Sequence, residues 1–293
     1  MATLLCFGFG YSAQHWLASH GASFDRIVAS VRDPAHAAEL NARAQRGLTV
    51  LVFDGTATSA ELRAAIAAAD AVLVSVPPDA AGDPVLAACG EALAAAPHLS
   101  SIVYLSTVGV YGDSGGAWVD ESSECRPHLD RDRRRLAAEQ AWQALGARKG
   151  VTVAILRLAG IYGPSRSALD NLRSGTARRI AKPGQVFNRI HVADIAQAIA
   201  AAFERCADGV FNVTDDEPAP QGDTIVFAAD LLGIAPPPEI SFAQALPAMS
   251  AMAASFYADV KRVRNGKLKS VLGVSLRYPT YREGLTALAR RPD

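Results

Sequence analysis

The chain has 293 residues, of which 50% are hydrophobic and 20% are charged, so it can bury one or two full cores and is excluded from the disordered class. Its 29 basic and 29 acidic residues leave no net charge, which argues against a nucleic-acid partner. The four cysteines lack the spacing of a metal site or a disulfide framework, so no metal is expected.

The apolar segments of the sequence indicate whether the protein is exported or inserted into a membrane. The chain begins with a strand-like run at 3–7, without the basic region and cleavage site of a signal peptide. No stretch approaches the roughly 20 uninterrupted apolar residues that a membrane span needs. We therefore expect a cytoplasmic protein with no membrane partner.

In chain order, apolar β-rich runs alternate with alanine-rich helical segments. Strands that are apolar throughout are expected where helices cover both faces of a sheet, and this alternation predicts parallel βαβ units. The fold class is therefore α/β, with a doubly wound, mostly parallel Rossmann sheet. Strands are predicted at 3–7, 26–31, 48–53, 71–76, 101–106, 151–158 and 210–213, and helices near 12–20, 35–45, 59–68, 84–96, 131–148, 192–205 and 221–232.

Two long connections and a change of character near residue 215 predict a second region. The connections at 107–130 and 159–190 follow strand ends, where open α/β sheets bind their ligands. We expect a Rossmann domain over 1–162, completed by about 190–214. A smaller C-terminal substrate lobe is expected over 163–293, made mainly of 163–189 and 215–293.

The first strand and the first helix are joined by a glycine motif of the form GxGxxA. Its glycines allow a tight turn and a close approach of the backbone to a pyrophosphate, which the start of the helix would bind. The alternative interpretation is an ordinary tight turn, but the position of the motif favours a dinucleotide cofactor. The predicted cofactor contacts here are Gly8, Gly10, Tyr11, Ser12 and Ala13.

The end of the second predicted strand indicates the type of cofactor. An NAD site usually has an acidic residue there, whereas this strand ends with Ser30 and Arg32. Arg32 could pair with a 2′-phosphate and Ser30 could add a hydrogen bond. We therefore predict NADP, with NAD as the other option, and assign Asp33 to the cap of the next helix. Arg32 could also be a solvated surface charge.

The next two strand ends supply further candidate contacts with the cofactor. Asp54 could contact the adenine, although it could equally be a turn residue. Val76 and Pro77 end the fourth predicted strand, where the chain would line the ribose.

Several segments together resemble the extended short-chain dehydrogenases/reductases, the superfamily of NAD-dependent epimerases and dehydratases. Residues 106–112 resemble its "SS..VYG" segment, 157–164 its "R..N.YGP" segment and 191–196 its "HV.D.A" segment. Residues 211–213 resemble its "YNV" strand, and 261–273 its "K...L...LG" segment. The resemblance runs in order over essentially the whole chain. It implies that Ser106 and Gly160 line the cofactor site.

The catalytic pair of that superfamily is missing. The resemblance places Thr107 at the position of the serine or threonine that polarises the substrate oxygen. Arg131 and Arg135 stand where the tyrosine and lysine of the YxxxK pair belong. An arginine cannot act as a general base near neutral pH, because its pKa exceeds about 12. Arg135 could still contact the cofactor, and the chain resembles atypical members that keep the fold and lose the pair.

Other side chains are candidates for the remaining roles. Tyr111 is the nearest candidate proton donor, although a packing role is about as well supported. Arg166, Arg189 and His191 lie where the family places substrate contacts, and His191 could instead be structural.

Two functions of different classes follow. The first is an NADP(H)-preferring oxidoreductase that transfers hydride on a polar small-molecule carbonyl or alcohol, or on a sugar-nucleotide-like substrate. The second is a catalytically inactive dinucleotide-binding regulator. The sequence leaves the substrate and an oligomeric state open.

Overall fold

The computed structural model describes residues 2–43 and 47–290. In this part of the chain seven parallel strands form the central sheet, in the order β11-β7-β5-β4-β1-β2-β3. The chain starts in the middle, proceeds to one edge and then fills the other, so the predicted doubly wound sheet is confirmed. The strands are β1 (Thr3–Phe7), β2 (Arg26–Val31), β3 (Leu48–Val52), β4 (Ala71–Val74), β5 (Ser101–Thr107), β7 (Thr152–Leu158) and β11 (Gly209–Val213).

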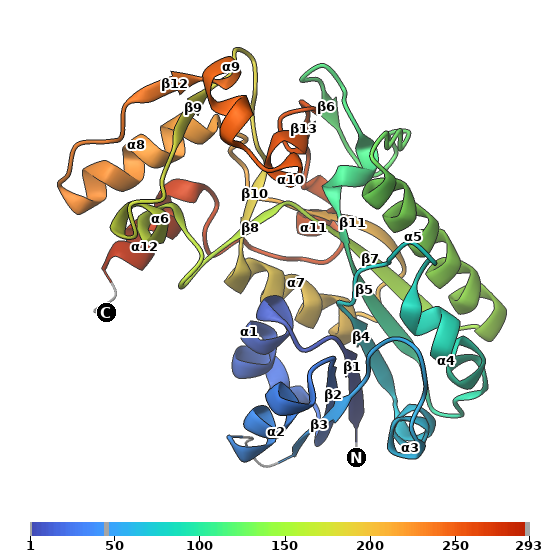
Figure 1. The fold of residues 1–293 in the computed structure, drawn as a ribbon. Helices are drawn as coiled ribbons and strands as arrows, with labels where there is room; N and C mark the ends of the chain where they lie inside the picture. Colours follow the sequence, from blue (N-terminus) through green and yellow to red (C-terminus); the bar gives the residue numbers. More distant parts are fainter. Residues whose placement is uncertain (1, 44–46, 291–293) are drawn as a thin grey trace.

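Helices cover both faces of the sheet (Figure 1). On one face Trp16 of α1 and Ile199 of α7 pack in the same core cluster as Leu4 of the central strand. On the other face Leu62 of α3 and Trp142 of α5 belong to a second cluster. The helices are α1 (Tyr11–His20), α2 (Pro34–Ala42), α3 (Ala60–Ala68), α4 (Pro84–Ala95), α5 (Asp130–Lys149), α7 (Val192–Glu204) and α11 (Gly266–Ser270).

The predicted helix starts at the Asp-Pro pairs are correct. Asp33 accepts a hydrogen bond from the amide of Ala35 at 2.8 Å, and Asp83 accepts one from Val85 at 2.9 Å. In each case the following proline occupies the first turn, where no amide hydrogen is needed. The predicted helix at 35–45 ends at Ala42, and its residues 44 and 45 lie outside the described part.

A second group of elements lies beyond the carboxyl ends of the strands (Figure 1). Leu169, Ala228 and Leu285 share one small core there, which joins α6, α8 and α12. This group combines segments from both sides of β11, although the domain boundaries stay a prediction. Its elements are α6 (Ala168–Arg173), β9 (Arg179–Ala181), α8 (Gln221–Leu232), β12 (Glu239–Ser241), α9 (Phe242–Ala245), α10 (Ala251–Ser255) and α12 (Tyr281–Ala289).

The two long predicted connections contain elements of their own. The first holds a 3-10 turn at Val108–Tyr111 and β6 (Trp118–Val119), which pairs with β13 (Arg262–Val263). The second holds β8 (Gly160–Tyr162), which pairs with β10 (Arg189–His191). Both connections return towards the strand ends and enclose the space above them. Among the described helices, none is both long and apolar enough to cross a bilayer.

Candidate functional site

Two adjoining cavities lie above the carboxyl ends of the strands. The first, here called the sheet cavity, has a volume of about 630 Å³ and is lined from the glycine motif to Thr107 and the first turn of α5. The second, the lobe cavity, has a volume of about 800 Å³ and lies among α6, α8 and α10. They meet at Gly160, Arg166 and Phe256, which line both, so they form one cleft.

The glycine motif shapes one end of the sheet cavity. Gly8 has a φ of 86°, and a Cβ there would lie 2.8 Å from the Ser75 hydroxyl, so only glycine fits. Gly10 begins α1 and lines the cavity, and no heavy atom lies within 4 Å of where its Cβ would be. Among the described residues no side chain caps this helix start. Its amides are therefore available to an anion such as a pyrophosphate.

The rest of the motif supports this turn. Ser12 lines the cavity and is largely buried, and Ala13 is buried against the sheet. Tyr11 also lines the cavity, and its hydroxyl donates to the carbonyl of Pro164 at 2.9 Å. Tyr11 therefore ties the glycine motif to the loop that carries Arg166.

The two candidate 2′-phosphate contacts on β2 differ in position. Ser30 is buried, and its hydroxyl accepts a hydrogen bond from the amide of Gly8 at 3.3 Å. In this structure Ser30 therefore supports the glycine turn. Arg32 is exposed and forms no ion pair with the described residues, while Asp33 caps α2. The free guanidinium is compatible with a phosphate partner.

Of the cofactor contacts predicted at the ends of β3 and β4, some line the sheet cavity and one does not. Asp54 is exposed and accepts hydrogen bonds from the amide and the hydroxyl of Thr56, at 2.9 and 2.7 Å, so it is a turn residue outside the sheet cavity. Pro77 lines this cavity, and Val76 lies against Gly8. Ser75, which the sequence analysis missed, lines it as well and donates a hydrogen bond to the carbonyl of Gly8.

Thr107 ends β5 at the centre of the sheet cavity. Its hydroxyl oxygen accepts a hydrogen bond from the amide of Gly109 at 3.1 Å. The hydroxyl proton is therefore left to donate into the cavity, towards a substrate oxygen. Beside it, Ser106 donates to the buried carboxylate of Glu139, so this cavity-lining serine is fixed in place.

Tyr111, the predicted proton donor, lines neither of the two cavities. Its side chain is buried, and its hydroxyl donates to Asn212 Oδ1 at 2.8 Å. Burial raises the pKa of Tyr111 to about 12, although the neighbouring Arg157 lowers it. The sequence motif at 106–112 places Tyr111 just after β5, but the direction of its side chain depends on its contact with Asn212 of β11.

The two arginines at the positions of the missing pair do line the sheet cavity. Arg135 is half-buried and donates to the hydroxyl of Tyr104 at 2.9 Å and to the carbonyl of Leu105 at 3.1 Å. Arg131 donates to the hydroxyl of Ser255 at 2.8 Å, which ties α5 to α10 across the cleft. Both therefore place positive charge along the cleft.

The three predicted substrate residues differ in their positions relative to the two cavities. Arg166 is exposed and lines both cavities, and its guanidinium lies 5.7 Å from the ring centre of Tyr11. Arg189 lines the lobe cavity, but it donates to the carbonyls of Phe187 and Ala219, at 3.0 and 2.9 Å. His191 lines neither cavity and caps α7 through Nδ1, which is compatible with its structural interpretation.

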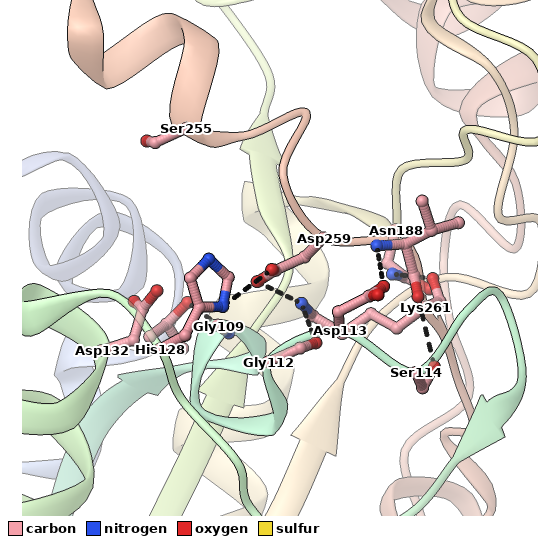
Figure 2. A network of polar contacts seen from close by, with 12 residues as sticks. Gly109, Gly112, Asp113, Ser114, His128, Asp132, Asn188, Ser255, Asp259 and Lys261 are labelled. Atoms are coloured by element: carbon pink, nitrogen blue, oxygen red, sulfur yellow. Dashed lines mark hydrogen bonds and ion pairs between the residues drawn. The ribbon is translucent and has the colours of Figure 1, made fainter.

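Some cavity residues escaped the sequence analysis. Asp132 lines the sheet cavity between the two arginines of α5, and Asp259 and Lys261 reach it from the segment after α10. Figure 2 shows Asp259 paired with Lys261 and His128. The charges of all three residues act on Asp132. Asp132 follows directly after the position expected for the tyrosine, and this neighbourhood could have identified it as a cavity residue. The others come from the C-terminal region, and sequence spacing does not place them.

Comparisons with known proteins agree with this architecture. Residues 83–214 match the NAD dependent epimerase/dehydratase family. A functionally unknown protein from Silicibacter pomeroyi DSS is 44% identical, with a TM-score of 0.87 over 99% of this chain and 98% of that one. A dTDP-glucose 4,6-dehydratase from Bacillus anthracis, solved in complex with NAD, is 15% identical, with a TM-score of 0.77 over 99% of this chain and 96% of that one.

A curated relative is a 3-diazoavenalumate denitrifying reductase from a Streptomyces species. It is 30% identical over 139 residues, which are 45% of this chain and 45% of the reductase. The match thus spans less than half of that protein. Taken with the parallel sheet and the cleft above its strand ends, these findings show a domain of the NAD-dependent epimerase/dehydratase family, the extended short-chain dehydrogenase/reductase type, over residues 83–214.

Proposed function

We propose that the protein is an NADP(H)-preferring oxidoreductase that transfers hydride to or from a polar small-molecule carbonyl or alcohol, with sugar-nucleotide-like compounds included. The observation that carries this proposal is the cleft itself. It runs from the open helix start at Gly10, past a Thr107 hydroxyl whose proton is free, into a second cavity large enough for a substrate.

The residues of the sheet cavity fit a dinucleotide. Gly10 leaves open space in front of uncapped amides, which would hold the pyrophosphate. Ser75 and Pro77 would line the ribose next to the nicotinamide, and Arg135 would lie beside it. A dinucleotide complex in a structural neighbour and the reductase activity named for the curated relative support the same assignment.

The preference for NADP(H) rests on Arg32. Its guanidinium is exposed at the end of β2 and is not used by the described residues, while the neighbouring acid caps a helix. A fixed positive charge at this strand end would pair with a 2′-phosphate and would find no such partner on NAD(H).

The cofactor would supply the hydride, and the protein would supply orientation and polarisation. Thr107 would donate its hydroxyl proton in a hydrogen bond to the substrate oxygen, which stabilises the negative charge that develops there. Phe256 and Arg131 would cover the cleft from α10 and α5 and limit the access of water.

The lobe cavity would receive the substrate. It combines the charged side chain of Arg166 with aromatic side chains that include Phe187 and Tyr257. This combination suits a polar compound with an apolar or ring-shaped part, because the ring would bury surface while Arg166 would bind an anionic or oxygen-rich end. A cytoplasmic location is part of the proposal.

The proposal is tested by following the oxidation of NADPH with an aromatic aldehyde, an α-diketone and a 4-keto sugar nucleotide. We expect substrate-dependent oxidation with at least one of these compounds. Tight, stoichiometric NADPH binding without oxidation in the whole panel would instead favour the regulatory alternative, which the missing tyrosine–lysine pair motivates.

A further inference from the structure

Asp132 lies on the wall of the sheet cavity, next to the turn that follows Thr107. It is the third residue of α5 and lines the sheet cavity, as Thr107 does. A Cβ on Gly109 would lie 2.6 Å from Asp132 Oδ1, so the glycine permits the carboxyl group to approach the turn that follows Thr107. The amide of Gly109 is itself bonded to the Thr107 hydroxyl. The side chains of Thr107 and Asp132 therefore both lie next to Gly109.

The carboxyl group is buried and has no hydrogen-bond partner. The Asp132 side chain is 9% exposed, and none of the hydrogen bonds within the described part of the chain involves its oxygens. Its nearest charged neighbour is Arg131 Nε, at 3.7 Å from Oδ1. A buried carboxyl group that accepts no hydrogen bond and has only this loose ion pair with Arg131 is costly, so its presence at a cavity wall calls for a ligand or a reaction that uses it.

The surroundings of Asp132 raise the pKa of its carboxyl group. Burial raises the pKa of Asp132 and the carboxylate of Asp259 adds to this, whereas Arg131, Lys261 and His128 oppose it, and the net direction is upward. A carboxyl group that stays protonated nearer to neutral pH is suited to donate a proton.

A polar network holds Asp259 at this position (Figure 2). Asp259 Oδ2 pairs with Lys261 Nζ at 3.1 Å, and Oδ1 pairs with His128 Nδ1 at 3.2 Å. Lys261 also donates to the carbonyl of Gly112 at 2.7 Å, which fixes the end of the turn after Thr107. The His128 side chain is 48% exposed, so the network reaches solvent.

We propose that Asp132 is the proton donor of this site, in place of the tyrosine that relatives carry one residue earlier on the same helix. This inference rests on the proposed function. In the direction of reduction, hydride from the reduced nicotinamide dinucleotide forms a C–H bond at the carbonyl carbon while the C=O π bond breaks. The electron pair moves to oxygen, the O–H bond of Asp132 breaks, and its proton passes to that oxygen. The products are the alcohol, the oxidised dinucleotide and the Asp132 carboxylate, which solvent reprotonates.

Asp259 is a positioning residue in this scheme. It contacts Lys261 and His128, and its negative charge keeps the proton on Asp132. Asp259→Asn should therefore shift the pH profile of the reaction to lower pH without removing the acid.

The first test is an infrared pH titration of the protonated carboxyl C=O stretch, without substrate. Asp215, whose pKa burial raises to about 8, contributes a persistent carboxyl signal of its own. We therefore expect the signal above the normal titration range of aspartate to be smaller in Asp132→Asn than in the wild type. The matched control is Asp130→Asn, two residues earlier on α5, where the aspartate side chain is 77% exposed. This control variant should keep the full carboxyl signal. A wild-type spectrum with no such signal, or one unchanged in Asp132→Asn, overturns the proposal.

The second test is NADPH oxidation with the carbonyl compound that the wild type reduces. Asp132→Asn should lower kcat about 10²- to 10⁴-fold, flatten the fall in rate at high pH, and leave the Kd for NADPH unchanged. Gly109→Ala, which displaces the carboxyl group, should also lower kcat, whereas Gly90→Ala, with open space around it, should not.

The two proposals fail in different ways. If the wild type binds no NADPH or oxidises none with any compound of the panel, the proposed function fails. If the wild type turns over and Asp132→Asn keeps its kcat and pH profile, only the proton donor is wrong.

Discussion

Thr107 lines the cleft, and its hydroxyl oxygen accepts a hydrogen bond from a backbone amide, which leaves the hydroxyl proton available to a substrate oxygen. Replacing Thr107 by Ala should lower kcat for carbonyl reduction about 10²- to 10³-fold, because one donor to the developing oxyanion is lost. Thr107→Ser, which keeps the hydroxyl group, should retain most of the rate. Steady-state kinetics measure both variants, and a Thr107→Ala enzyme with wild-type kcat would remove Thr107 from the mechanism.

Individual residues were predictable where a local motif determines their position. Gly8, Gly10 and Thr107 line or shape the sheet cavity because their motifs are continuous in sequence and lie at strand ends. The side chains of Ser30 and Tyr111 are directed towards distant partners, here Gly8 and Asn212, and a local sequence motif does not determine that direction.

At the scale of elements, the caps and the apolar strands followed from local chemistry. Asp33 and Asp83 begin helices where aspartate precedes proline, and the doubly wound parallel sheet followed from the alternation of strands and helices. The pairing of β9 with β12 was not predictable, because it joins three-residue strands that lie nearly 60 residues apart. The β6–β13 pair is likewise short and distant in sequence.

One buried ion pair joins α5 to β7 below the cleft. Arg157 Nη2 lies 2.7 Å from Glu139 Oε2, and both side chains are almost fully buried. Glu139→Gln would leave Arg157 charged and unpaired, so we expect the free energy of unfolding to fall by about 3–5 kcal/mol.

Chemical denaturation measures this change. The control is Glu91→Gln, which removes a surface pair with Arg148 whose side chains are 93% and 60% exposed and should change stability little. Equal losses in the two variants would mean that the buried pair has no special role in holding α5 in place.

At the scale of the whole molecule, a buried carboxyl group lies between the sheet and the lobe. Asp215 follows β11, is 1% exposed, and its amide donates to the carbonyl of Arg189 at 2.7 Å. Burial raises the pKa of Asp215 to about 8, even though Arg189 lowers it. The folded protein thus binds this proton at pH values where the unfolded chain has released it.

The sign of the pH dependence follows from this difference. Between about pH 4 and pH 8 the folded state holds more protons, so raising the pH lowers stability, by up to about 1.4 kcal/mol per pH unit for one group. Asp215→Asn should make this slope smaller, whereas Asp230→Asn, on the exposed face of α8, should leave it unchanged. Denaturation curves recorded from pH 5 to 8 measure how the free energy of unfolding changes with pH. If this dependence is unaltered in Asp215→Asn, the expected proton binding is contradicted.

The central claim concerns the whole cleft: that it binds NADP(H), with Arg32 as the selecting charge. The most direct measurement is a calorimetric titration with NADPH and, in parallel, with NADH, after a check for cofactor retained through purification. Arg32→Ala is compared with Arg26→Ala, an exposed arginine at the opposite end of β2. We predict that NADPH binds more tightly than NADH and that only Arg32→Ala removes this preference. Failure of the wild type to bind either nucleotide would contradict the account.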